Sequence, residues 1–525
     1  MATAQTTAKR PDFTNEPFTD FSKPEIAKEQ QDALKKIRSE FGRTYPLWIG
    51  GQKVETGDLL QSHNPSKPDE VIGLFHKASL ELASKAVEEA HKAFDRWKRV
   101  PAGERSEILF RAADIIRERR FEFNAVLCFE VGKSWAEAEA DTAETIDFCE
   151  FYGRENLRLS APQPLIPIKG ERNYLAYIPL GAGAVIPPWN FPCAIMAGLT
   201  LAAIVVGNTV VLKPSSDSPA IAYKFMEAMW DAGLPKDVVQ FCPGSGAKVG
   251  DTIVGHPLTR FVGFTGSKDV GLHISKKASE TAPGQIWIKR TVLEMGGKDA
   301  IIVDEEADVD AAVEGVAASA FGFQGQKCSA CSRAIVSEKI YDQFVEKLKA
   351  RVEKIKVGPT DDFSNYMGPV INEGAMNDIL NYIEVGKKEG RLLTGGKRVA
   401  GKDGFFIEPT VIVDVKAGAK IEQEEIFGPV LAVVKAKDFD EALKVANGTE
   451  FGLTGAVYSK NPEKLRRSAE EFHVGNLYFN RKCTGALVGA HPFGGFNMSG
   501  TDSKSGGPDY LLLFTQAKTI AEKIV

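Results

Sequence analysis

One cysteine stands where a nucleophile could act. Cys328 lies in the stretch FGFQGQKCSACSR, after an expected helix and before an expected strand. Gly322 and Gly325 allow a tight loop that aims a side chain into a cleft. A thiolate in such a loop can form a thioester, from which hydride or acyl transfer can follow. The alternatives are a buried structural cysteine or, with Cys331, a CxxC redox or half-zinc pattern.

Zinc is the weaker of these alternatives. The chain has no second CxxC, and its seven histidines show no ligand spacing. Because a structural zinc site needs four ligands at regular spacing, the sequence predicts no metal.

Two polar residues are candidate partners for Cys328. Glu294, in TVLEMGGKDAII, ends an expected strand and so would lie at the carboxyl edge of a sheet. A partly desolvated carboxylate there could have a raised pKa and take a proton from water. Asn190, in PPWNFP, could donate its amide hydrogen to a developing oxyanion. The structural alternatives are a cap or surface acid for the glutamate and a turn residue for the asparagine.

Phosphate-binding signals are present but unusual. No GxGxxG follows the first strand of the α/β region. Instead Phe264-Thr265-Gly266-Ser267 ends a strand and opens a helix, which leaves free N–H groups and a positive dipole end for a pyrophosphate. Lys213-Pro214-Ser215 ends another strand and places an ammonium at the same edge. Each signal is weak alone, because strand–Gly–helix turns recur in α/β domains.

The elements that must position these residues alternate between short apolar strands and helices. Strands are expected at 182–186, 209–213, 238–242, 260–264 and 287–294, with helices such as 220–232 and 268–278 between them. A second alternation follows, with strands at 300–303, 333–336, 410–413 and 430–434 and helices at 309–322 and 340–355. This order predicts two parallel, doubly wound α/β domains that meet near Gly296-Gly297.

The first part of the chain has a different pattern. Residues 24–41 predict a polar helix outside the main domains, and residues 45–57 predict a hairpin around Gly50-Gly51. Residues 80–94 and 104–123 have the periodicity of long amphipathic helices.

Composition limits the partners. The 525 residues are 43% hydrophobic with a formal net charge of −5, which predicts two or three soluble domains and no binding to nucleic acid or anionic membranes. The apolar run 193–212 has the length of a membrane span, but Gly207-Asn208-Thr209 divides it, so a buried helix, a turn and a buried strand are expected. Seven irregularly spaced cysteines and a start without an apolar leader predict a cytoplasmic location.

Six motifs together resemble a known family. PWNFP, LKPS, FTGS, LEMGGKD, GQKCSA and EEIFGPV follow one another in this order between residues 188 and 430. The chain resembles the aldehyde dehydrogenase superfamily from about Tyr45 to its C-terminus. The resemblance implies a variant Rossmann cofactor domain without the glycine fingerprint, a catalytic domain, and a β-flap that pairs with a neighbouring subunit.

This resemblance divides the chain. Residues 1–44 would form an N-terminal helical extension, and residues 45–164 with 179–296 the NAD(P)-binding domain. Residues 297–495 would form the catalytic domain, and 165–178 with 496–525 the oligomerisation flap, whose strands are sought at 165–178 and 510–520.

The resemblance also assigns roles. Cys328 would be the nucleophile and Glu294 the general base, while Asn190 and the backbone N–H of Cys328 would meet the oxyanion. Lys213 would bind the adenosine ribose, Gly266 and Ser267 the pyrophosphate, and Glu425 the nicotinamide ribose with Phe427 against it. The full cofactor set is Ile186, Pro187, Pro188, Trp189, Lys213, Ser215, Ser216, Gly246, Gly250, Phe264, Thr265, Gly266, Ser267, Val270, Glu425 and Phe427.

One departure concerns the cofactor. Many family members carry a glutamate that holds the adenosine ribose, where this chain has Ser216. The repulsion that would exclude a 2′-phosphate is then absent. NAD is expected, and NADP is possible.

The end of the chain narrows the expected substrate. FHVGNLYFNRKCTGALVGAHPFGGFNMSGT, like the N-terminal extension ending FGRTYPLWIGG, resembles the branch of the family that oxidises L-glutamate γ-semialdehyde to L-glutamate. Backbone N–H groups at Gly485-Ala486 would hold the α-carboxylate with help from the Ser329 hydroxyl, and Phe191 and Phe493 would box the aliphatic chain. A homodimer or larger homo-oligomer and a functional pairing with a separate proline dehydrogenase are expected. Another ω-semialdehyde acid as substrate, a catalytically silent scaffold, and an ordinary turn at Gly485 remain alternatives.

Overall fold

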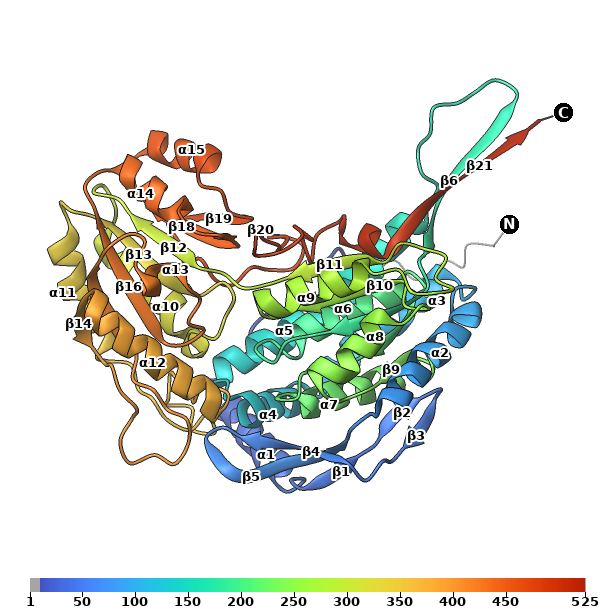
Figure 1. The fold of residues 1–525 in the computed structure, drawn as a ribbon, viewed down its shortest axis with the longest axis horizontal. Helices are drawn as coiled ribbons and strands as arrows, with labels where there is room; N and C mark the ends of the chain where they lie inside the picture. Colours follow the sequence, from blue (N-terminus) through green and yellow to red (C-terminus); the bar gives the residue numbers. More distant parts are fainter. Residues whose placement is uncertain (1–9, 525) are drawn as a thin grey trace.

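A computed structural model describes residues 10–524 of the chain, which form two seven-stranded sheets covered by helices and a projecting two-stranded arm (Figure 1). The structure therefore has the expected aldehyde dehydrogenase-like α/β fold. Residues 1–9, the start of the predicted N-terminal extension and of the segment examined for a leader, lie outside the described residues.

The first sheet has the order β11-β10-β7-β8-β9-β2-β3. Its five parallel strands are β7 (Ala182–Ile186), β8 (Thr209–Leu212), β9 (Val239–Phe241), β10 (Phe261–Thr265) and β11 (Arg290–Glu294). The chain runs from β7 outward to β9 and then returns to β10 and β11 on the other side. The order therefore reverses between β7 and β10, and ligands of such sheets bind outside the carboxyl ends of the strands at this point.

Helices cover both faces of this sheet, which explains why its strands are almost wholly apolar. One face packs against α2 (Leu80–Trp97), α8 (Asp251–Gly255) and α9 (Lys268–Ser279). The other face packs against the cluster of α3 (Ala102–Glu118), α4 (Arg120–Val131), α5 (Trp135–Ser160), α6 (Ala194–Val205) and α7 (Pro219–Asp231). Since α6 is buried on all sides, it is apolar all round. The hairpin of β2 (Leu47–Ile49) and β3 (Gln52–Val54) extends the sheet antiparallel to β9.

The second sheet has the order β14-β15-β16-β13-β12-β18-β19. Its strands are β12 (Asp299–Val303), β13 (Cys331–Ser337), β14 (Arg391–Thr394), β15 (Thr410–Val415), β16 (Val430–Ala436), β18 (Thr454–Tyr458) and β19 (Asn476–Phe479), all parallel except β14. One face packs against α10 (Val309–Phe321) and α11 (Tyr341–Val352), and the other against α12 (Glu373–Glu389), α13 (Lys420–Gln423), α14 (Phe439–Asn447) and α15 (Pro462–Glu471).

Three smaller sheets complete the fold. β1 (Arg43–Tyr45), β4 (Leu59–Asn64) and β5 (Lys67–His76) form the first, and β17 (Phe451–Gly452) pairs with β20 (Phe496–Asn497) in the second. β6 (Glu171–Pro179) pairs antiparallel with β21 (Thr515–Lys523) to form the arm that projects from the molecule in Figure 1. A 3-10 turn, η3 (Tyr510–Phe514), precedes β21 and is buried in the core of the first sheet. Of the predicted flap segment 496–525, only the last strand therefore lies in the arm.

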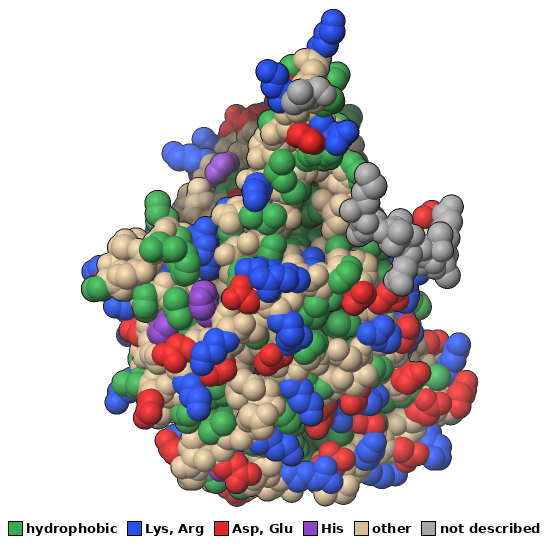
Figure 2. Space-filling model, turned by 90° about the vertical axis from the view of Figure 1, so that its right-hand side faces the viewer, with side chains coloured by type: hydrophobic (Ala, Val, Ile, Leu, Met, Phe, Trp, Pro, Cys, Tyr) green, Lys and Arg blue, Asp and Glu red, His purple; other side chains and the backbone are tan. Residues whose placement is uncertain are grey.

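The surface carries mixed charge. On the face that Figure 2 shows, acidic and basic side chains are interspersed, and hydrophobic side chains gather toward the arm. Exposed apolar residues of the arm and its connection are Leu165, Ile166, Ile168, Tyr174, Ile520 and Ile524.

Most strand predictions agree with the structure to within a few residues, and the helix, turn and strand expected at 193–212 are present as α6 and β8. Residues 24–41 do contain the predicted helix, α1 (Pro24–Arg38). The prediction that this helix lies outside the main domains is wrong, because α1 buries Leu34 and Ile37 against α4. The helix predicted at 104–123 is two helices, since the chain leaves helical geometry at Arg119. No helix among residues 10–524 combines the length and apolar character that crossing a membrane requires.

Candidate active site

Cys328 lies between the two sheets, in the loop that enters β13. Before it, the 3-10 turn η2 (Gly322–Gly325) places Phe323 and Gln324 at positive φ, 48° and 57°. The side chain of Gln324 fixes this strained turn by donating to the carbonyls of Gly132 and Pro369, both at 2.8 Å. Cys328 is partly exposed, whereas the other six cysteines, all within the described residues, are buried and free.

The surroundings of the Cys328 thiol disfavour its ionisation. Burial raises its pKa well above the ordinary value, and the carboxylates of Asp299, Glu425 and Glu294 add to the rise. Because the thiolate is the reactive form, the thiol proton must leave before or as the sulfur bonds to carbon.

Asn190 connects the two halves at this point. It follows β7 in the loop at the reversal of the first sheet, and it is buried. Its Nδ2 donates to the carbonyl oxygen of Gln326 at 3.1 Å, two residues before the nucleophile. The amide group therefore lies beside the Cys328 loop, where an oxyanion would need a donor.

Glu294 ends β11 and its carboxylate is buried. Oε1 accepts from the Ser503 hydroxyl at 2.6 Å and from the Ser503 N–H at 3.3 Å, and Oε2 accepts from the Gly495 N–H at 3.3 Å. Burial outweighs these hydrogen bonds and raises the pKa of Glu294 to about 7. A base with such a pKa is partly ionised near neutral pH and can activate water. Sequence reasoning missed Ser503 and Gly495, because they lie about two hundred residues away along the chain.

A cavity opens at the carboxyl edge of the first sheet, where the strand order reverses between the paired strands β7 and β10. It contains every predicted cofactor residue except Gly250, which lies beside the Lys213 side chain instead. The predicted residues on its walls are Ile186, Pro187, Pro188, Trp189, Lys213, Ser215, Ser216, Gly246, Phe264, Thr265, Gly266, Ser267, Val270, Glu425 and Phe427. Asn190, Asp217, Met295 and Gly296 also line it and were not in the predicted set.

Several features of this cavity fit a dinucleotide. The N-terminus of the twelve-residue helix α9 opens beside Gly266, which suits a pyrophosphate. Lys213 is buried without a carboxylate partner in the described structure, and burial lowers its pKa to about 8. A Cβ at Gly296 would collide with the Glu425 carboxylate, so only glycine lets the chain pass so close to it.

Two carboxyl groups set the charge of this wall. Glu425 Oε1 accepts from the Gly297 N–H at 2.9 Å, and burial raises the pKa of Glu425 to about 7. Asp217, next to Ser216, accepts from Asn372 Nδ2 at 3.2 Å, and burial raises its pKa as well. The carboxylate that is absent at Ser216 is therefore present one residue further along.

A second cavity shares Cys328 with the first. All five predicted substrate residues line it, namely Phe191, Ser329, Gly485, Ala486 and Phe493, together with Glu294. Sequence reasoning missed the remaining walls, which are Glu144, Phe148, Ile195, Leu199, Thr265, Met295, Leu487, Val488, His491, Ser505 and Tyr510. Glu144 and Phe148 lie four residues apart on α5, a spacing that places both on one helix face.

Charged groups frame this second cavity. The Phe191 ring lies 3.8 Å from Lys133 Nζ, and Lys133 pairs with Asp141 at 2.9 Å in full burial. Glu144 is partly exposed, and burial and the charge of Asp141 raise its pKa to about 8.

The loop at Gly485 has a backbone that favours glycine, with φ at 77°. Arg481 donates to the carbonyl oxygens of Thr484 and Gly485, at 2.9 and 3.1 Å. Because its guanidinium is engaged there, Arg481 supports the loop.

Cys328 is thus partly exposed and shared by two cavities, one at the reversal of strand order in the first sheet and one that is largely apolar. This arrangement can be compared with known proteins. The model of the aldehyde dehydrogenase family matches residues 48–520. The chain belongs to this family. No group of three or more histidine, cysteine, aspartate or glutamate side chains within residues 10–524 could hold a metal ion.

Three relatives of this aldehyde dehydrogenase illustrate the similarity. It is 57% identical to the 1-pyrroline-5-carboxylate dehydrogenase of Geobacillus sp. (strain WCH70), over 97% of this chain and 99% of the relative. It is 51% identical to a crystal structure of 1-pyrroline-5-carboxylate dehydrogenase from Thermus with bound NAD, with a TM-score of 0.96 over 98% and 100% of the two chains. Proline utilization A from Bdellovibrio bacteriovorus is 44% identical with a TM-score of 0.96, and the match covers 98% of this chain and 54% of that one.

Proposed function

We propose that this aldehyde dehydrogenase oxidises L-glutamate γ-semialdehyde, the open form of 1-pyrroline-5-carboxylate, to L-glutamate with NAD, as the second step of proline catabolism. The observation that carries this proposal is that Cys328 is shared by two cavities, one fit for a dinucleotide and one ending at the Gly485 loop. Relatives named 1-pyrroline-5-carboxylate dehydrogenase match nearly the full chain, which supports the same substrate.

The chemistry begins at Cys328. As the thiol gives up its proton to water, the sulfur attacks the aldehyde carbon, and the resulting oxyanion receives hydrogen bonds from Asn190 Nδ2 and the backbone N–H of Cys328. NAD, when bound, accepts the hydride, and a thioester remains on Cys328. Glu294 takes a proton from water as the water oxygen bonds to the thioester carbon. The C–S bond then breaks, the carboxylic acid leaves, and the sulfur takes the proton back from Glu294 to restore the Cys328 thiol.

The far end of the substrate cavity suits an amino acid. Backbone N–H groups at Gly485-Ala486 and the Ser329 hydroxyl would hold the α-carboxylate. Phe191 and Phe493 would flank the methylene groups. The Glu144 carboxyl group lines the same cavity, and an α-ammonium nearby would lower its raised pKa and pair with it.

Cofactor contacts follow from the first cavity. Lys213 and Glu425 would bind the two riboses, and Gly266 and Ser267 the pyrophosphate. NAD is the proposed cofactor. NADP stays possible at Ser216, although the carboxylate of Asp217 on the same wall opposes a 2′-phosphate.

Assembly and supply form the remainder of the proposal. The exposed apolar residues of the β6–β21 arm support pairing between subunits, as a homodimer or larger homo-oligomer. A functional pairing with a separate proline dehydrogenase, which would supply the substrate, is supported by the similarity to proline utilization A. Free cysteines agree with the cytoplasmic location predicted above.

The boundary at Gly296-Gly297 separates β11 of the first sheet from β12 of the second, which supports the proposed domain division.

A substrate comparison tests the proposal. NADH formation is measured with glutamate semialdehyde, succinate semialdehyde and propanal, and kcat/KM is expected to be highest for glutamate semialdehyde. A higher value for succinate semialdehyde would assign a different ω-semialdehyde acid. Absence of NADH with all three aldehydes, in protein shown to bind NAD, would favour a catalytically silent scaffold.

A further inference from the structure

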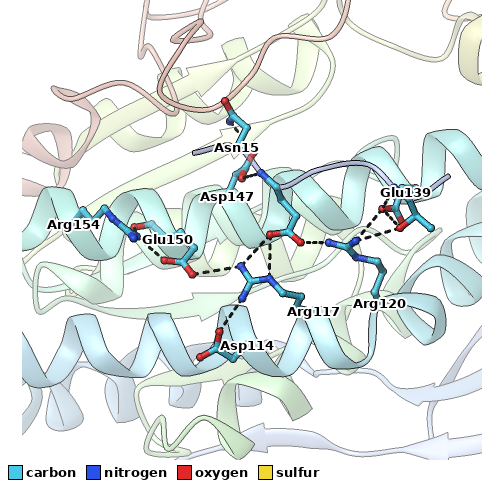
Figure 3. A network of polar contacts seen from close by, with 10 residues as sticks. Asn15, Asp114, Arg117, Arg120, Glu139, Asp147, Glu150 and Arg154 are labelled. Carbon is cyan, nitrogen blue, oxygen red and sulfur yellow. Dashed lines mark hydrogen bonds and ion pairs between the residues drawn. The ribbon is translucent and has the colours of Figure 1, made fainter. Parts of the chain in front are cut away.

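The segment of residues 10–20 has neither helix nor strand, yet the structure fixes it tightly along α5 (Figure 3). Asp147 Oδ1 accepts from the Glu16 N–H at 2.7 Å, and Glu139 Oε1 accepts from the Thr19 N–H at 2.9 Å. The Glu16 carboxylate also meets Arg117 at 3.0 Å and pairs with Arg120. These contacts fix the segment against α3, α4 and α5, far along the chain from residues 10–20.

Asn15 is the point at which this segment reaches the substrate cavity. Its Nδ2 donates to Asp147 Oδ2 at 2.8 Å and to the carbonyl oxygen of Val488 at 2.9 Å. Val488 lines the substrate cavity, as does Phe148, the neighbour of Asp147 on α5. Both amide hydrogens of one side chain therefore connect the segment, α5 and the wall of the substrate cavity.

The loop around Val488 also packs directly on the segment. A Cβ built on Gly489 would lie 3.1 Å from both the Phe13 and the Phe151 rings, and these rings meet edge to face at 5.3 Å. The Gly489 N–H donates to the Gly506 carbonyl at 2.8 Å. The loop therefore contacts residues 10–20 through the Phe13 ring and through the hydrogen bond from Asn15 to Val488.

Hydrogen bonds fix the loop at both of its ends. Arg481 fixes the carbonyl oxygens of Thr484 and Gly485, and Asn15 fixes that of Val488. Ala486 and Leu487 lie between these points, and the Leu487 N–H donates to His491 Nδ1 at 3.2 Å. A shift of the Val488 peptide would therefore change where the N–H groups at Gly485 and Ala486 point.

We propose that Asn15 is a positioning residue for substrate specificity. It sets the backbone of residues 485–488 so that the N–H groups of Gly485 and Ala486 meet the α-carboxylate of the substrate, without touching the substrate itself. This inference rests on the proposed function, since it assumes that the loop binds that carboxylate. An aldehyde without a carboxylate does not use the loop, so its oxidation does not depend on Asn15.

The test uses Asn15→Leu in the full chain, with glutamate semialdehyde and propanal as substrates. Loss of a neutral hydrogen bond should raise KM for glutamate semialdehyde roughly three- to tenfold, with kcat and the oxidation of propanal unchanged. Asp147→Asn, a nearly isosteric change, should shift KM in the same direction. Exposed Thr14, which makes no hydrogen bond in the described structure, gives the matched control Thr14→Ala, with no effect expected.

A purely structural role makes a different prediction. Thr19→Val removes the hydroxyl contact with Glu139 and loosens the segment away from the loop. If Asn15→Leu and Thr19→Val lower Tm alike and neither changes the KM for glutamate semialdehyde, the positioning role is wrong. Equal losses for both substrates in Asn15→Leu and Asp147→Asn would also overturn it.

The same experiment separates this inference from the proposed function. Failure of the proposed function appears already in the wild-type protein, as a lack of preference for glutamate semialdehyde over propanal. In the double variant Asn15→Leu/Gly485→Val, the effect of Asn15→Leu should largely disappear because both changes act through one loop. Full additivity of the two effects would contradict the inference.

Discussion

The two cavities that meet at Cys328 are built in different ways. The walls of the cofactor-side cavity come mainly from the ends of neighbouring strands, β7, β8 and β10, in one sheet. The substrate-side cavity combines α5, α6, the Cys328 loop and the long connection between β19 and η3. Local motifs can therefore describe the first cavity, whereas only the folded chain assembles the second.

Their charges differ as well. Beside the carboxyl groups of Glu425 and Asp217, the cofactor side offers a helix N-terminus and the buried ammonium of Lys213, both of which suit phosphates and hydroxyl groups. The substrate side offers the carboxyl groups of Glu144 and Glu294 beside apolar rings. Since Cys328 is common to both cavities, a substitution of this nucleophile should lower the oxidation of every aldehyde substrate. A substitution in the wall of one cavity should leave ligand binding in the other cavity intact.

The largest effect is expected where the cavities meet. Cys328→Ala should lower aldehyde oxidation by roughly a thousandfold or more, because no thioester can form. NAD affinity, measured by calorimetry, should stay within the wild-type range. Cys331 lies three residues away and its thiol is buried, so Cys331→Ala should retain most turnover. If Cys331 could replace Cys328 as the nucleophile, Cys328→Ala would keep high residual activity.

The next effect concerns Glu294 and pH. Its pKa is raised to about 7 by burial, so the ionised base should accumulate, and thioester hydrolysis accelerate, as pH rises through about 7. Glu294→Gln should abolish this rise and lower hydrolysis by roughly a hundredfold or more. Because the folded state favours the protonated acid, ionisation above the ordinary pKa of 4.5 costs stability, and Glu294→Gln should be at least as stable as wild type at pH 8. Stopped-flow rates between pH 6 and 9 and thermal unfolding would measure both, and an unchanged pH profile in the variant would exclude Glu294 as the base.

A smaller and selective effect is expected on the substrate side alone. Gly485→Val should lower kcat/KM for glutamate semialdehyde roughly ten- to hundredfold, because φ of 77° disfavours a branched side chain and the resulting backbone shift moves the N–H donors away from the charged carboxylate. Oxidation of propanal and NAD affinity should change little. Equal losses for the two aldehydes, in a folded variant that binds NAD, would mean that the loop has no special role for the α-carboxylate.

The smallest effect is expected on the cofactor side. Ser216→Glu places a second carboxylate beside Asp217, which should raise KM for NADP severalfold by repulsion of its 2′-phosphate, while KM for NAD stays nearly constant. Steady-state kinetics with both cofactors measure the ratio. A larger loss with NAD than with NADP would move the adenosine ribose away from Ser216.

The difference between the cavities explains what the sequence could predict. Thr265-Gly266-Ser267 and Lys213 were found from local order, because strand ends that follow one another in a parallel sheet meet at one edge. Glu144 could not be found this way, since its position at the cavity depends on how α5 packs beneath residues 485–493. The burial of α1 and the contact of Asn15 with Val488 were missed for the same reason: both join residues more than eighty positions apart. The Gly485 loop was found only because its motif resembles known relatives.

The central claim, that both cavities serve a thioester on Cys328 which Glu294 hydrolyses, can be tested in one measurement. Glu294→Gln is mixed with NAD and glutamate semialdehyde, quenched in acid after the first turnover to keep the α-amine protonated, and analysed by mass spectrometry of the intact protein and its peptides. We predict one equivalent of NADH per active site and one γ-glutamyl group on the peptide that contains Cys328. A burst without an adduct, or an adduct on the peptide of another cysteine such as Cys483, would contradict the account.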